Sequence, residues 1–122
     1  MSQVRLPHDH GPQARAIAEK IPAMEEFQTL ADIFKQLSDG NRVRIFWLLC
    51  HCETCVTDLS AMVGMSSPAV SHHLRQLKTA GLITSRREGK EVYYRAVETE
   101  KAGRLHDALE DMMTIACPME EK

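Results

Sequence analysis

The stretch from Met65 to Ala96 constrains the fold more than any other part of this chain. Ser66 or Ser67 can cap a helix here, because a side-chain hydroxyl accepts hydrogen bonds from the free amide groups of the first turn. Pro68 suits that turn, where a missing N–H costs nothing, and Gly81 is a typical helix terminator. Apolar residues at i, i+4 and i+7 predict one buried stripe: Val70, Leu74 and Leu77.

Two β-rich runs follow this predicted helix. Residues 82–87 and 92–95 flank Glu88-Gly89-Lys90, which favours a turn. Upstream, residues 56–63 predict a shorter helix, and Gly64 predicts the turn between the two helices. Two helices joined by a tight turn and followed by a basic hairpin are the layout of a winged helix-turn-helix. The fold class is therefore mainly α with a small β-hairpin.

Polar side chains on the predicted helix point away from its apolar stripe and suit a DNA groove. Ser71, His72 and Gln76 can hydrogen-bond base edges, and Arg75 can reach a guanine or a phosphate. The basic residues of the hairpin suit phosphate or the minor groove. The full set of candidate DNA contacts is Ser67, Ser71, His72, Arg75, Gln76, Lys78, Arg86, Arg87 and Lys90.

The charge is unevenly distributed along the chain. The formal net charge is −2, yet residues 66–96 hold six basic and two acidic residues, a local charge of +4. A basic face on an acidic body is enough for phosphate contact and limits non-specific binding. A merely solvated charged surface is the alternative interpretation.

The 122 residues fit one domain. We expect a flexible tail at 1–12, the winged domain at 13–116 and a second tail at 117–122. Helices are predicted at 14–20, 23–37, from Asp39 or Asn41 to about 50–53, and at 99–115. The expected order in short form is ααα-α-ββ-α. The chain has no run of about 18 apolar residues and no secretory signal, so we expect a cytoplasmic protein without a membrane partner.

The first and last helices carry more apolar residues than a small winged domain can bury. This pattern predicts a homodimer through those helices, with two recognition helices about 34 Å apart on a palindromic double-stranded operator. The alternative is that these helices only complete the core of a monomer.

Four segments, in order, resemble the ArsR/SmtB family of repressors. Residues 37–45, LSDGNRVRI, are similar to the entry of that family's second core helix, and residues 54–59, TCVTDL, to its Leu-Cys-Val-x-Asp-Leu segment. Residues 67–74 are similar to its recognition helix, and residues 89–94 to its wing. The resemblance covers about residues 31–112. It implies a homodimeric, metal-responsive repressor that leaves its operator when an inducer, usually a metal ion, binds.

Three thiols lie within six residues, at Cys50, Cys52 and Cys55. Disulfides are rare in a reducing compartment, so the cluster indicates metal binding or thiol oxidation sensing. Thiolates prefer soft or borderline ions, so the expected inducer is Cd(II), Pb(II), Hg(II), As(III), Cu(I) or Zn(II). A redox-sensing repressor using the same cysteines is the alternative. A small-molecule substrate is not expected, because no oxyanion-forming glycine motif or cofactor loop indicates an enzyme.

The cysteine pattern departs from the family. Its thiol-binding members carry Cys-Val-Cys where this chain has Cys55-Val56-Thr57, so one cysteine of that pair matches. Further candidate ligands are His8, His10, His51 and Cys117. The family's second metal site, on the last helix, aligns with positions that lack both imidazoles: Glu98, Glu100, Asp111 and Thr114. His106 and Glu110, four residues apart, are interpreted as a solvent-exposed pair.

Overall fold

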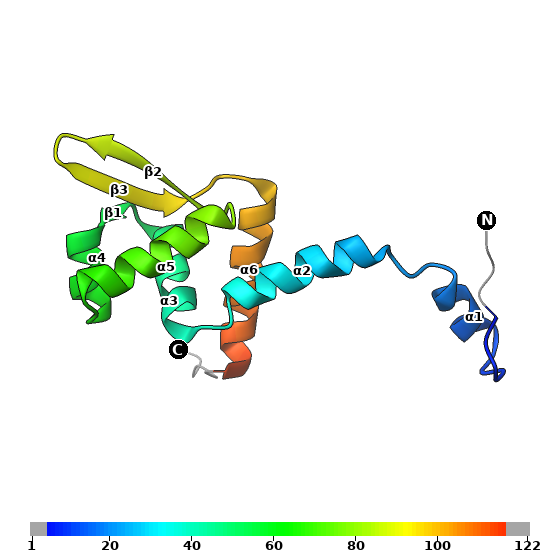
Figure 1. The fold of residues 1–122 in the computed structure, drawn as a ribbon. Coiled ribbons are helices and arrows are strands. Elements are labelled where there is room, and N and C mark those ends of the chain that lie inside the picture. Colours follow the sequence, from blue (N-terminus) through cyan, green and yellow to red (C-terminus); the bar gives the residue numbers. More distant parts are fainter. Residues whose placement is uncertain (1–4, 117–122) are drawn as a thin grey trace. The chain divides into compact units, whose positions relative to one another are not determined.

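The computed structural model describes residues 5–116 (Figure 1). The predicted C-terminal tail, including Cys117, lies outside these residues. The chain divides into two compact units, residues 1–32 and 33–122, and each is described by itself. The expected division into tails and one winged domain stays a prediction.

The first unit holds helix α1, Pro12–Ala18, and the start of helix α2, Met24–Gln36. Helix α1 begins two residues earlier than predicted, because Pro12 occupies its first turn, where the fixed φ of proline is already helical. The Asp9 carboxylate accepts hydrogen bonds from the Gly11 amide and from Arg15 at 2.8 Å each. These bonds fasten the entry to the helix.

Helix α3, Gly40–His51, opens the second unit's helical core. The carboxylate of Asp39 caps it by accepting from the backbone amides of Asn41 and Arg42. Hydrogen bonds from these amides, with the Arg42 bond contributing most, hold the pKa of Asp39 below its usual range. The cap fixes where α3 begins, and so which of its faces meets the next helices.

Helices α4, Val56–Val63, and α5, Ser67–Thr79, form the predicted pair. Gly64 between them has a φ of 68°, a conformation that glycine adopts without strain. Ser66 is the N-cap of α5 and accepts from the Ala69 amide. At the far end, Gly81 has a φ of 78°, and the Leu82 amide donates back to the Leu77 carbonyl. This is a Schellman ending.

Strands β2, Ile83–Glu88, and β3, Glu91–Ala96, pair antiparallel, with Glu88 opposite Glu91. Gly89 opens the two-residue turn with a φ of 64°. A third strand, β1, Thr54–Cys55, pairs with the other edge of β3, which gives the order β1-β3-β2. Helix α6, Glu100–Ala116, follows the hairpin.

The fold class is confirmed as a mainly helical winged helix-turn-helix with a small hairpin. Five helices precede the hairpin, in agreement with the five predicted ranges, whereas the short form ααα-α-ββ-α counts only four. Strand β1 was not expected, because two residues are too short to show an alternating pattern. Its existence depends on the non-local partner β3.

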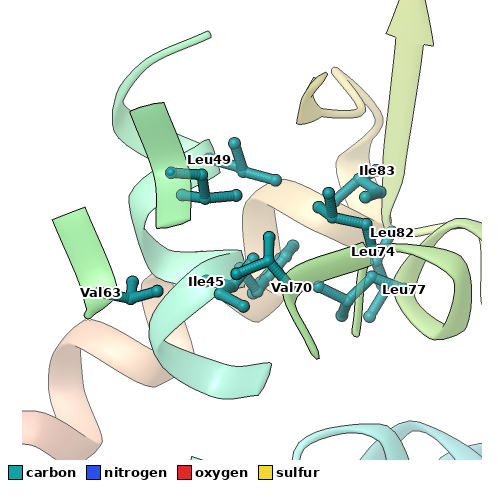
Figure 2. Packing of buried hydrophobic residues seen from close by; sticks show 10 residues of the cluster. Ile45, Leu49, Val63, Val70, Leu74, Leu77, Leu82 and Ile83 are labelled. Carbon is teal, nitrogen blue, oxygen red and sulfur yellow. The ribbon is translucent and has the colours of Figure 1, made fainter. Parts of the chain in front are cut away.

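The core lies where α3, α4 and α5 meet the start of the hairpin (Figure 2). The predicted stripe of α5 is fully buried, with Val70 and Leu77 at 0% exposure and Leu74 at 1%. The other members of this cluster come from α3, α4 and the segment entering β2: Ile45, Phe46, Leu49, Leu59, Val63, Leu82 and Ile83.

Large apolar side chains of α2 and α6 stay outside this core. Helix α2 buries none of its residues, and Phe34 is 54% exposed. On α6, Leu105 and Leu109 pack partly against the core, whereas Met112 and Met113 are each 49% exposed. Within the second unit, Phe34, Met112 and Met113 therefore expose apolar surface.

Truncating one residue of the α5 stripe should destabilise the protein. Leu74→Ala removes a fully buried side chain, so we expect the free energy of unfolding, measured with urea, to fall by about 2–5 kcal/mol. Met62→Ala is the control, because Met62 is 52% exposed and should change stability by roughly 0.5 kcal/mol or less. Equal losses in the two variants would contradict the assigned core.

Candidate functional site

The surface of α5 presents the residues expected to face DNA. His72, Arg75 and Lys78 are exposed, and Ser71 and Gln76 are half-buried. His73, by contrast, is 8% exposed and lies on the core side, with its Nε2 atom 3.9 Å from an Asp39 carboxylate oxygen. Burial lowers the pKa of His73, which favours the neutral imidazole. The two adjacent histidines thus have different roles.

Polar contacts fix the angle between the helices that present this surface. The hydroxyls of Ser60 on α4 and Ser67 on α5 lie 3.3 Å apart. Arg44 on α3 donates to the Val63 carbonyl at 2.6 Å, which satisfies an acceptor at the end of α4. Ser67, a candidate DNA contact, therefore also serves within the helix pair.

The wing is fastened both to α5 and to the thiol segment, residues 50–55. Lys78 donates to the Ser85 hydroxyl at 2.7 Å. Arg86 makes two bonds to the Glu53 carboxylate, at 2.9 and 3.0 Å, and one to Glu88 at 2.7 Å. Its guanidinium lies 5.0 Å from the centre of the Tyr93 ring. The carboxylates of Glu53 and Glu88 already bind the Arg86 guanidinium, so Arg86 is less available for the predicted phosphate contact.

The other two predicted wing contacts are open to a ligand. Arg87 and Lys90 are exposed. Within residues 5–116, neither forms a salt bridge. Of the predicted wing contacts, these two have the freest charges for phosphate.

The three thiols occupy different environments. Cys50 is half-buried on α3, and burial, with the Glu110 charge second, raises the pKa of its thiol to about 11. Cys52 is exposed and donates to the Leu48 carbonyl at 3.4 Å. Cys55 is buried in β1, opposite Tyr93. Among the described residues, the three thiols do not form a cluster of ligand atoms close enough to share a metal ion as they stand.

The other predicted ligands are spread over the chain. His8 and His10 are exposed in the first unit, with ring centres 6.2 Å apart. At the family's last-helix positions, Glu98 pairs with Arg95 and Glu100 with Arg104. Asp111 and Thr114 are exposed. Arginines thus partner two of these four groups.

Helix packing brings together three side chains that the sequence did not group. His51, at the end of α3, meets His106 and Glu110 of α6, and their ligand atoms all lie within 4.8 Å of one another. The spacing of His106 and Glu110 was visible in the sequence, but the contact with α3 was not. We call these three residues the α3–α6 cluster.

The arrangement of α4, the Gly64 turn, α5 and the β2–β3 wing makes this a protein of the winged helix-turn-helix class. A family model described as bacterial regulatory protein, arsR family, matches residues 39–85. Arsenic resistance transcriptional regulator ArsR2 of Pseudomonas putida is 39% identical over 83 residues, 67% of this chain and 71% of that protein. The chain belongs to the arsR family.

Two further comparisons agree with this assignment. The transcriptional repressor SmtB homolog of Synechocystis is 38% identical over 85 residues, 70% of this chain and 64% of that protein, so the chain spans just under two thirds of that repressor. A homodimeric winged helix-turn-helix domain from Mycobacterium bovis superposes with a TM-score of 0.67 and 28% identity, covering 81% of this chain and 92% of that one. These relatives are named as regulators, which supports the expectation that the protein is not an enzyme.

None of the helices in the described part of the chain has the length and apolar character needed to cross a membrane.

The Glu53–Arg86 pair should control the stability of strand β1. In Glu53→Gln the two charged bonds to Arg86 are lost, so we expect the amides of Thr54 and Cys55 to exchange with solvent roughly severalfold faster. Hydrogen exchange read by mass spectrometry or NMR measures this. Glu88→Gln is the control, because Glu88 is more exposed and makes one bond to Arg86. Equal exchange in both variants would contradict the coupling.

Proposed function

We propose that this protein is a homodimeric, DNA-binding transcriptional repressor that releases its operator when a thiophilic metal ion binds. The proposal rests on the exposed polar face of α5, which lies opposite the buried stripe of the same helix and next to the basic wing. Relatives named as repressors and resistance regulators support the same function.

The chemistry of the α5 face suits the major groove. Arg75 can donate two hydrogen bonds to a guanine, and Gln76 and His72 can read neighbouring base edges. Arg87 and Lys90 supply phosphate contacts from the wing, with weaker support from Arg86, which Glu53 and Glu88 engage. Base contacts then set specificity, and wing contacts set orientation and affinity.

A second copy of the chain is the proposed cover for the exposed apolar residues of α2 and α6. A two-fold dimer would place two α5 helices on successive major grooves and would match a palindromic operator. The Mycobacterium bovis neighbour is described as homodimeric, which supports this assembly.

The thiol segment has a direct route to the wing. Glu53 binds Arg86, and Cys55 pairs through β1 with the central strand of the sheet. Ligation of Cys55 together with Cys50 or Cys52 would draw residues 52–55 out of this arrangement. The ion would thereby loosen the wing and weaken its DNA contacts. Release requires this difference in DNA affinity between the metal-bound and the metal-free protein.

Burial raises the pKa of Cys50 to about 11, which slows oxidation of this one thiol. Oxidants react with the thiolate, and this thiol holds its proton at neutral pH. A thiophilic ion can displace that proton as it binds.

Removing one recognition contact should weaken operator binding. For Arg75→Ala we expect an about tenfold or greater loss of affinity for the protein's own promoter fragment, measured by gel shift at fixed salt. Lys101→Ala removes the same charge from an exposed site on α6 and is the control. If the two variants bind like the unchanged protein, α5 is not the reading helix.

The inducer is tested on the reduced protein bound to that fragment. Addition of Cd(II), Pb(II), Zn(II), As(III), Hg(II) or Cu(I) in turn should release the DNA for at least one ion. The variant Cys50→Ser/Cys52→Ser/Cys55→Ser should bind DNA normally and stay bound at the same metal concentration. Release of this variant would overturn the role of the thiols, and release of the unchanged protein by peroxide but not by metal would establish the redox alternative.

A further inference from the structure

The α3–α6 cluster brings three potential ligand atoms to nearly equal separations. His51 Nε2 and His106 Nε2 lie 3.1 Å apart. The Glu110 Oε1 atom lies 3.1 Å from His51 Nε2 and 3.0 Å from His106 Nε2. The side chains come from two helices and are 24–45% exposed, so solvent ions can reach them.

No placement of protons satisfies all three contacts at once. A carboxylate oxygen only accepts, and each neutral imidazole nitrogen carries either a proton or a lone pair. If both Nε2 atoms donate to Glu110, two N–H groups face each other. If one donates to the other, the acceptor's lone pair faces the carboxylate. A cation at the centre would satisfy all three, because it accepts a lone pair from each.

The spacing also fits a small divalent ion. Zinc lies about 2.0–2.1 Å from imidazole nitrogen and 2.0–2.2 Å from carboxylate oxygen in tetrahedral sites, which sets neighbouring ligand atoms about 3.3 Å apart. The observed 3.0–3.1 Å separations need a shift of a few tenths of an ångström. Two imidazoles and a carboxylate are ligands that zinc accepts, with water in the fourth position.

Trp47 supports the carboxylate as an outer partner. Its indole Nε1–H donates to Glu110 Oε1 at 3.0 Å, and its ring lies against His51 with centroids 4.3 Å apart. Such bonds orient a ligand before the metal arrives. His51 and His106 also line a pocket of about 400 Å³ that Cys50 and Cys52 border.

We propose that His51, His106 and Glu110 form a zinc-type metal site within one protomer, separate from the three thiols. This site would bind a borderline divalent ion through nitrogen and oxygen, and it would fasten the C-terminal end of α3 to α6. The inference goes beyond the proposed thiol sensor and does not depend on DNA binding.

Trp47 is the one tryptophan of the chain and gives a local signal. Zinc chloride added to the reduced, full-length protein should change Trp47 fluorescence, with affinity measured by competition against a chromogenic chelator. His106→Gln and Glu110→Gln should each weaken this zinc affinity about tenfold or more and abolish the fluorescence change. In the Cys50→Ser/Cys52→Ser/Cys55→Ser background, which removes the thiols as zinc ligands, zinc should raise the thermal unfolding midpoint, and adding His106→Gln or Glu110→Gln should abolish that rise.

Three control variants separate this site from the other ligands. Asp107→Asn makes the charge change of Glu110→Gln at an exposed neighbouring position and should bind zinc normally. The triple cysteine-to-serine variant and His8→Ala/His10→Ala should keep the fluorescence response. Unfolding midpoints without metal verify that each variant is folded.

The proposal is overturned if His106→Gln and Glu110→Gln bind zinc like the unchanged protein, or if the triple cysteine variant alone loses the response. Gel shifts without added metal distinguish failure of this proposal from failure of the repressor proposal. His106→Gln should bind the promoter fragment normally. Failure of the repressor proposal would instead appear as normal binding by Arg75→Ala.

Discussion

Burial of one apolar stripe of α5 against α3 and α4 is the contact on which the rest of this protein depends. Val70, Leu74 and Leu77 are removed from water almost completely, so the opposite face of α5 must lie in solvent. The same packing sets where α5 ends and where the hairpin begins. The exposed polar surface of α5, which we propose reads DNA, therefore depends on the core, and any loss of core packing also displaces its residues.

Strand β1 shows how a small element can join two larger ones. Its two residues follow the exposed Cys52 and pair with the middle strand of the wing, and Glu53 adds two charged bonds to Arg86. Sheet pairing and ion pairing thus act on the same short segment. The thiol segment is therefore joined directly to the wing through the β1–β3 pairing and the Glu53–Arg86 bonds.

Features with a local cause were predictable from the sequence. The Ser66 cap, the turn at Gly64 and the ending at Gly81 each follow from one residue type at one position. Strand β1 and the α3–α6 cluster have non-local causes, since each needs a partner more than 35 positions away. The engagement of Arg86 by Glu53 was missed for the same reason, because a basic residue on a hairpin shows its charge but not its neighbours.

The uncovered apolar residues of α2 and α6 have a consequence for dosage. A protein that buries such faces only against a second copy is stabilised by its own concentration. At low concentration the fraction present as dimer rises with protein concentration, so the amount of dimer grows with the square of the monomer concentration. For the proposed dimer, small changes in synthesis or degradation would then give larger changes in the amount of dimer.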